Sequence, residues 1–106
     1  MAAAREPDAQ ALLAARMTVP EHVVYREFPN ETVILNLESG TYHGLNATAA
    51  RMVEVLGSGV PVSAAIDSLA DEFQQPREVI ERDVLALCRA LSERGLITRD
   101  VGSRPS

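Results

Sequence analysis

The residues that could carry chemistry in this chain are few and lie far apart in the sequence. His22 and His43 are the two histidines, and Cys88 is the one cysteine. Neither histidine has a neighbouring His, Cys or paired carboxylate that would form a metal site or a proton relay. Cys88 lies within a helical apolar pattern, with no helix start beside it to activate the thiol. We therefore interpret it as a buried structural residue rather than a nucleophile paired with His43.

Two other motifs also lack a catalytic pattern. The turn at residues 57–59 has neither the lysine nor the spacing of a phosphate-binding loop, and we expect it to end a helix. Acidic residues alternate with Arg77 and Arg82, which is typical of a solvent-exposed helical face with i,i+4 pairs. We therefore predict that the protein is not an enzyme and has no catalytic residue, no cofactor and no metal site.

The length and charge of the chain limit its partners. Its 106 residues correspond to one domain, and 15 acidic residues against 10 basic ones, all arginine, give a net charge of −5. Nucleic-acid binding depends on a positive surface, so we expect a positively charged or apolar partner and no nucleic acid. No apolar run could span a membrane, and the first residues lack a secretory apolar region. We expect a cytoplasmic protein that does not bind membranes.

Short strands are predicted before residue 46. Residues 22–28 are enriched in β-branched and aromatic side chains, and residues 32–37 form a second strand after a turn. A tight reversal at residues 38–40, with Gly40 taking a positive φ, leads to a third short strand at 41–45. This pattern predicts an N-terminal three-stranded antiparallel sheet.

Nearly every later segment has helical period. We expect Asn46 to cap a first helix that ends at Gly57. A second helix is predicted over 62–73 and a third from Pro76 to about Arg94. Gly95 is the expected terminator of the third helix, and residues 96–98 are expected to fold back onto the core. The fold class is therefore α+β, with a three-stranded sheet followed by three helices.

The chain divides into three parts. We expect residues 1–17 to be a flexible N-terminal lead-in, because an isolated helix of that length is marginal in water. Residues 18–100 form the predicted domain, and residues 101–106 are a tail. Because a strand edge can pair with itself, a homodimer remains an open alternative.

The third strand is a candidate binding edge. Gly40 and Gly44 flank it and leave its backbone accessible, and Tyr42 adds an aromatic surface. An extended peptide could add to this edge through main-chain hydrogen bonds. The alternative is that the third helix covers the edge.

Two other classes of function remain. The second and third helices resemble the end of a winged-helix DNA-binding core, but four arginines on the third helix and its end are balanced by four acidic residues. A helix that docks into the major groove normally carries net positive charge. The remaining class is a small subunit that stabilises an enzyme complex.

The run at residues 33–46, followed by Thr48 and Ala49 opening a helix, resembles the PqqD-type family, as does the segment at residues 80–96 with Arg94 and Gly95 near its end. This family includes the pyrroloquinoline quinone (PQQ) biosynthesis protein D and standalone leader-peptide-binding proteins of lasso peptide clusters. The resemblance covers roughly residues 19–98. It implies a RiPP recognition element, a non-catalytic, winged-helix-like peptide chaperone (RiPP meaning a ribosomally made, post-translationally modified peptide).

The resemblance also implies a binding mode and its residues. The leader of a precursor peptide would add as an antiparallel strand between the third strand and the third helix, and a separate modifying enzyme or leader peptidase would act on the attached core. The first wall of this groove would be Thr41, Tyr42, His43, Gly44 and Leu45. The second wall would be Val79, Arg82, Asp83, Ala86, Arg89 and Ala90.

Overall fold

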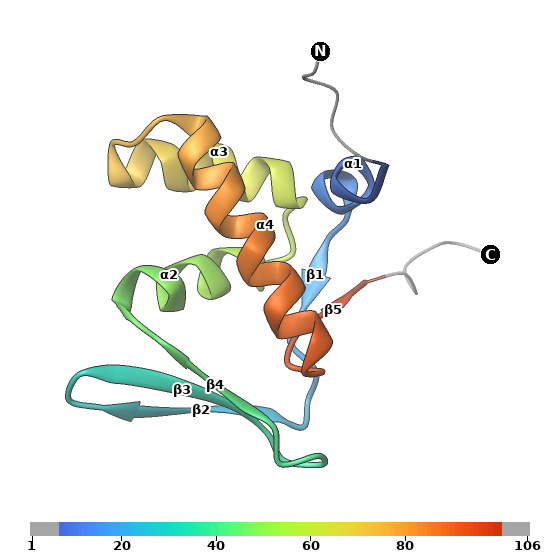
Figure 1. The fold of residues 1–106 in the computed structure, drawn as a ribbon, viewed down its shortest axis with the longest axis vertical. Helices are drawn as coiled ribbons and strands as arrows, with labels where there is room; N and C mark the ends of the chain where they lie inside the picture. Colours follow the sequence, from blue (N-terminus) through green and yellow to red (C-terminus); the bar gives the residue numbers. More distant parts are fainter. Residues whose placement is uncertain (1–6, 101–106) are drawn as a thin grey trace.

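The strands and helices form in the order that the sequence predicts. The computed structural model describes residues 7–100. Its main elements are the strands β2 (Val23–Phe28), β3 (Glu31–Asn36) and β4 (Tyr42–Leu45), and the helices α2 (Ala47–Leu56), α3 (Val62–Phe73) and α4 (Arg77–Glu93). The predicted α+β fold, a three-stranded antiparallel sheet followed by three helices, is confirmed (Figure 1).

The sheet has the order β2-β3-β4, and its two faces have different environments. Ile34 lies opposite His43 on β4, and the next residue, Leu35, lies opposite Tyr42. Because successive side chains of a strand point to opposite faces, Ile34 and Leu35 belong to different faces. Ile34 is fully buried, whereas Tyr42 is 65% exposed. The helices lie on one side of the sheet (Figure 1), so the face of Ile34 is covered and that of Tyr42 is open.

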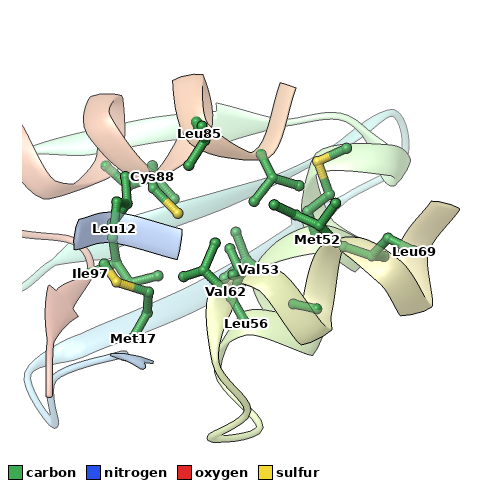
Figure 2. Close-up of a cluster of buried hydrophobic side chains, with 14 of the residues drawn as sticks. Leu12, Met17, Met52, Val53, Leu56, Val62, Leu69, Leu85, Cys88 and Ile97 are labelled. Carbon is green, nitrogen blue, oxygen red and sulfur yellow. The ribbon is translucent and has the colours of Figure 1, made fainter. Parts of the chain in front are cut away.

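The core forms where the apolar stripes of the helices meet the covered face of the sheet. Val53 and Leu56 of α2, Ile66 and Leu69 of α3, and Val84 of α4 are fully buried. Figure 2 shows side chains from several elements converging on this cluster. Burial of these side chains removes apolar surface from water and positions α2 and α4 relative to β4.

The helix ends follow the predicted capping pattern. The side-chain oxygen of Asn46 accepts a hydrogen bond from the backbone N–H of Ala49 at 2.8 Å, which satisfies an amide that the helix leaves unpaired. After α4, Gly95 has a φ of +69°, a conformation that glycine adopts without steric cost. The chain then returns to the core, where Leu96 and Ile97 are fully buried.

Structure also forms upstream of Thr18, where the sequence predicts a flexible lead-in. Helix α1 (Pro7–Ala14) packs against α3, and β1 (Met17–Thr18) pairs with β5 (Thr98–Arg99). Leu12 and Met17 are buried. Tertiary burial stabilises a helix that would be marginal alone, so the packed unit begins before residue 18. Residues 1–6 of the lead-in and the predicted tail at 101–106 lie outside the described residues.

Candidate functional site: a strand edge beside a helical groove

Strand β4 forms one edge of the three-stranded sheet. It pairs with β3 on one side, and no described strand pairs with it on the other. Such an edge carries a row of backbone donors and acceptors that another extended chain could use. The carboxyl end of α4 comes down to the start of β4 (Figure 1), where the hydroxyl of Thr41 lies 2.7 Å from the carbonyl of Arg94.

The register of the ladder shows which backbone groups face this open edge. The N–H of Asn36 donates to the carbonyl of Thr41 at 2.9 Å, so this pair is hydrogen-bonded. In an antiparallel ladder, hydrogen-bonded and non-hydrogen-bonded pairs alternate. The pair of Ile34 and His43 is therefore bonded, and the backbone groups of Tyr42 and Gly44 point away from β3. These two residues present the donors and acceptors of the free edge.

A hollow of about 380 Å³ lies between β4, α2 and α4. It is lined by His43, Asn46, Thr48, Ala49, Met52, Asp83, Ala86, Leu87 and Ala90. The lining combines small side chains, which allow a backbone to approach closely, with apolar Met52 and Leu87. A single carboxylate, that of Asp83, lies on the α4 wall. We call this hollow, together with the free edge of β4, the peptide groove.

Two hydrogen bonds attach one end of the peptide groove to the end of α4. The side-chain amide of Asn36 donates to the carbonyl of Gly95 at 3.0 Å. The hydroxyl of Thr41 donates to the carbonyl of Arg94 at 2.7 Å. These bonds hold the start of β4 against the carboxyl end of α4, so the spacing between the strand and the helix is fixed at this end.

The structure brings four of the predicted site residues together. His43, Asp83, Ala86 and Ala90 line the peptide groove. The Asp83 carboxylate is 51% exposed and lies 3.7 Å from the guanidinium of Arg82, which is 75% exposed. An acidic group at this position can pair with a positive charge or accept a hydrogen bond from a ligand in the hollow.

The other predicted residues occupy different positions. Thr41 anchors β4 to α4 through its hydroxyl, and Leu45 is 1% exposed and belongs to the core. Tyr42 and Gly44 alternate with His43 along the strand, so the Tyr42 side chain lies on the open face of the sheet. The backbone groups of Tyr42 and Gly44 face the free edge. Val79, Arg82 and Arg89 lie on α4 outside the lining.

The binding residues predicted from the sequence include none from the α2 wall of the peptide groove. Asn46, Thr48, Ala49 and Met52 all line the hollow. The sequence contained a partial signal, because Asn46 and Thr48 start the helix that directly follows β4. Their closeness to α4 depends on how α2 and α4 pack, which helical period alone does not specify.

Other reactive groups lie away from the groove or are inaccessible. Cys88 is fully buried, and burial raises the pKa of its thiol to about 11, which suppresses the nucleophilic thiolate. His22 lies 3.7 Å from the carboxylate of Glu38. Within residues 7–100 no three His, Cys, Asp or Glu side chains gather as metal ligands. None of the helices described has the length and apolar character needed to cross a membrane.

Comparison with known proteins identifies one family whose model matches this chain. A model of the family described as coenzyme PQQ synthesis protein D (PqqD) matches residues 31–97, which is more than half of the chain. A search of curated proteins found no match.

Two solved structures are similar to the chain. One is described as TbiB1 in complex with the TbiA(beta) leader peptide. It is 30% identical, and the match covers 83% of this chain and 99% of the other, with a TM-score of 0.66. The second is described as lasso peptide synthetase B1 complexed with the leader peptide. It is also 30% identical, and the match covers 78% of this chain and 98% of the other, with a TM-score of 0.68.

Proposed function

Because the chain belongs to the PqqD family, we propose that it is a peptide chaperone that binds the leader segment of a ribosomally made precursor peptide. The two similar structures are complexes with leader peptides. The single observation that carries the proposal for this chain is the unpaired edge of β4 beside the peptide groove. An added strand gains affinity from main-chain hydrogen bonds and specificity from the pockets next to it.

The proposed binding mode assigns a role to each wall. The leader lies antiparallel to β4 and exchanges hydrogen bonds with the backbones of Tyr42 and Gly44. Alternate leader side chains enter the hollow, where Ala86 and Ala90 leave space and Met52 provides apolar contact. Asp83 selects a positive charge or a hydrogen-bond donor at its position.

The proposed role is presentation of the peptide rather than catalysis. The bound leader keeps the attached core peptide close to a separate modifying enzyme or leader peptidase, which carries out the chemistry. We place this step in the cytoplasm, where precursor peptides are synthesised. The benefit of holding both partners is a higher effective concentration of the core at the enzyme.

Fluorescence anisotropy tests the proposal, with a labelled leader peptide from a precursor gene identified next to the gene of this protein. The wild type should bind it, and Tyr42→Pro should weaken binding at least about tenfold, because proline removes a donor that faces the free edge. Circular dichroism and the melting temperature should show that Tyr42→Pro remains folded, since the lost N–H does not bond β3.

Two results would contradict the proposal. Normal leader binding by folded Tyr42→Pro would exclude strand addition at this edge. Binding to duplex DNA that weakens steeply with salt, together with no binding to the leader, would favour the DNA-binding alternative.

A further inference from the structure

A second hollow lies on the opposite flank of α2 from the peptide groove, between this helix and the β2–β3 hairpin. Its volume is about 590 Å³, larger than the hollow of the peptide groove. The residues that give it its chemical character are Tyr25, Glu27, Phe28, Ala50, Arg51 and Glu54. We call it the hairpin pocket.

Two aromatic side chains contribute to the wall of the hairpin pocket. Tyr25 is 42% exposed and Phe28 is 56% exposed, and both come from β2. Large exposed rings that gather at one hollow are typical of a surface that receives another molecule. The faces of aromatic rings attract cations, arginine in particular.

The one cation in this pocket is already engaged. The guanidinium of Arg51 donates to Glu72 through Nε and Nη2, each at 2.9 Å, and to Glu54 at 3.0 Å. The hydrogen bonds from Arg51 also lower the pKa of the Glu72 carboxyl. The positive charge of Arg51 is thus balanced by Glu72 and Glu54. The acidic residues in and beside the pocket therefore outnumber its one arginine.

The remaining carboxylates can accept a further cation. Glu27 forms no ion pair with any described residue, and the Glu54 side chain is 70% exposed despite its bond to Arg51. The charge of Glu54 also reaches the aromatic wall, because it raises the pKa of Tyr25 as a second cause after burial. The pocket therefore combines ring faces with a negative potential.

Helix α2 separates the two hollows, so they can be occupied at the same time. Thr48, Ala49 and Met52 line the peptide groove, whereas Ala50 and Arg51 line the hairpin pocket. A leader strand along β4 would not fill the hairpin pocket. The hairpin pocket therefore needs an occupant other than the leader segment that pairs with β4.

We propose that the hairpin pocket docks a basic side chain, arginine or lysine, on the surface of the processing enzyme, an inference that rests on the proposed function. The cation would lie against Tyr25 and Phe28 and pair with Glu27 and Glu54. Charge complementarity favours this occupant over a second copy of the chain, because each copy carries a net charge of −5. A negative pocket likewise repels nucleic acid.

The chemistry of the pocket can be tested first with a small probe. In a ¹⁵N NMR titration of the full chain with the peptide acetyl-Ala-Arg-Ala-amide, amide shifts should concentrate at Tyr25, Glu27 and Glu54. The same peptide with norleucine in place of arginine should cause much smaller shifts. Shifts confined to groove residues such as His43 and Ala86, or equal responses to both peptides, would overturn the proposal.

Variants then test the docking of the enzyme itself. Glu27→Gln with Glu54→Gln should weaken binding of the purified processing enzyme by about tenfold in calorimetry. Ala47→Arg, which places the chain's own cation at the rim of the pocket, should weaken it as well. Glu93→Gln is the control for the loss of one carboxylate, since it removes the same kind of charge from an exposed position at the end of α4.

Leader affinity separates this inference from the proposed function. All of these variants should bind the leader peptide as the wild type does. If the wild type binds the leader but the pocket variants retain full enzyme affinity, the hairpin pocket is not the docking site, while the proposed function stands. If the wild type binds no leader, the proposed function itself fails, and the docking inference fails with it.

Discussion

The side-chain amide of Asn36 donates a hydrogen bond to the carbonyl of Gly95 at 3.0 Å, which joins the end of β3 to the end of α4. The oxygen of the same amide accepts from the backbone N–H groups of Glu38 and Ser39 at 2.9 and 3.1 Å. One buried polar side chain therefore organises the turn before β4 and attaches it to α4. The geometry of the peptide groove depends on this connection.

Asn36→Ala should lower the free energy of unfolding by about 2–3 kcal/mol, because three hydrogen bonds are lost and the Gly95 carbonyl loses its side-chain partner. Urea denaturation monitored by circular dichroism measures this change. Asn30→Ala, at an exposed turn, is the control and should change stability by less than about 0.5 kcal/mol. Equal stability of the two variants would show that Asn36 does not hold the turn to α4.

Leu12→Ala tests whether α1 belongs to the packed unit. Leu12 is 3% exposed, so we expect a loss of about 2–4 kcal/mol from lost burial and the cavity left behind. Leu37→Ala, at a side chain that is 58% exposed, should cost much less. If Leu12→Ala were as stable as Leu37→Ala, residues 7–14 would be a lead-in that does not contribute to the fold.

The buried thiol of Cys88 predicts a dependence of stability on pH. Burial raises its pKa from 9.0 to about 11, so the folded state holds this proton more tightly than the unfolded state. The contribution of the buried, protonated thiol to the free energy of unfolding is fully present below about pH 9 and is lost as the pH rises through about 11. The difference in unfolding free energy between the wild type and Cys88→Ala should therefore shrink from pH 8 to pH 11. A difference that stays constant over this range would show that the thiol does not titrate as a buried group.

Filling the peptide groove should block the leader without unfolding the protein. Ala86 is exposed and lines the hollow, so Ala86→Leu should weaken leader binding at least about tenfold while the melting temperature stays close to that of the wild type. Ala64→Leu adds the same bulk to an exposed position on α3 and should leave affinity unchanged. Similar affinities for the two variants would place the leader elsewhere.

Much of the fold is predictable from local patterns. The strand segments, the Asn46 cap and the span of α3 follow from residue type and period, because each depends on neighbours in the sequence. Gly95 ends α4 for the same reason. The packing of α1 is different, because an alanine-rich segment carries a weak local signal and its burial depends on contacts with α3 that are distant in sequence.

The site is predictable in outline only. Its strand and its long helix can be identified from the sequence, but the register that turns the Tyr42 backbone towards the free edge depends on the hydrogen bond between Asn36 and Thr41. The contribution of α2 depends on helix packing. The hairpin pocket leaves no recognisable motif, because its lining residues come from two strands and a helix.

Amide hydrogen exchange at β4 tests the central claim most directly, because it reports on the backbone groups that an added strand would use. In the free protein the amides of Tyr42 and Gly44 should exchange fast and that of His43 slowly, since of these three residues His43 is the one whose pair with β3 is hydrogen-bonded. Addition of a saturating leader peptide should slow Tyr42 and Gly44 by at least about tenfold. A leader that binds while these two amides continue to exchange at their free rates would contradict strand addition to β4.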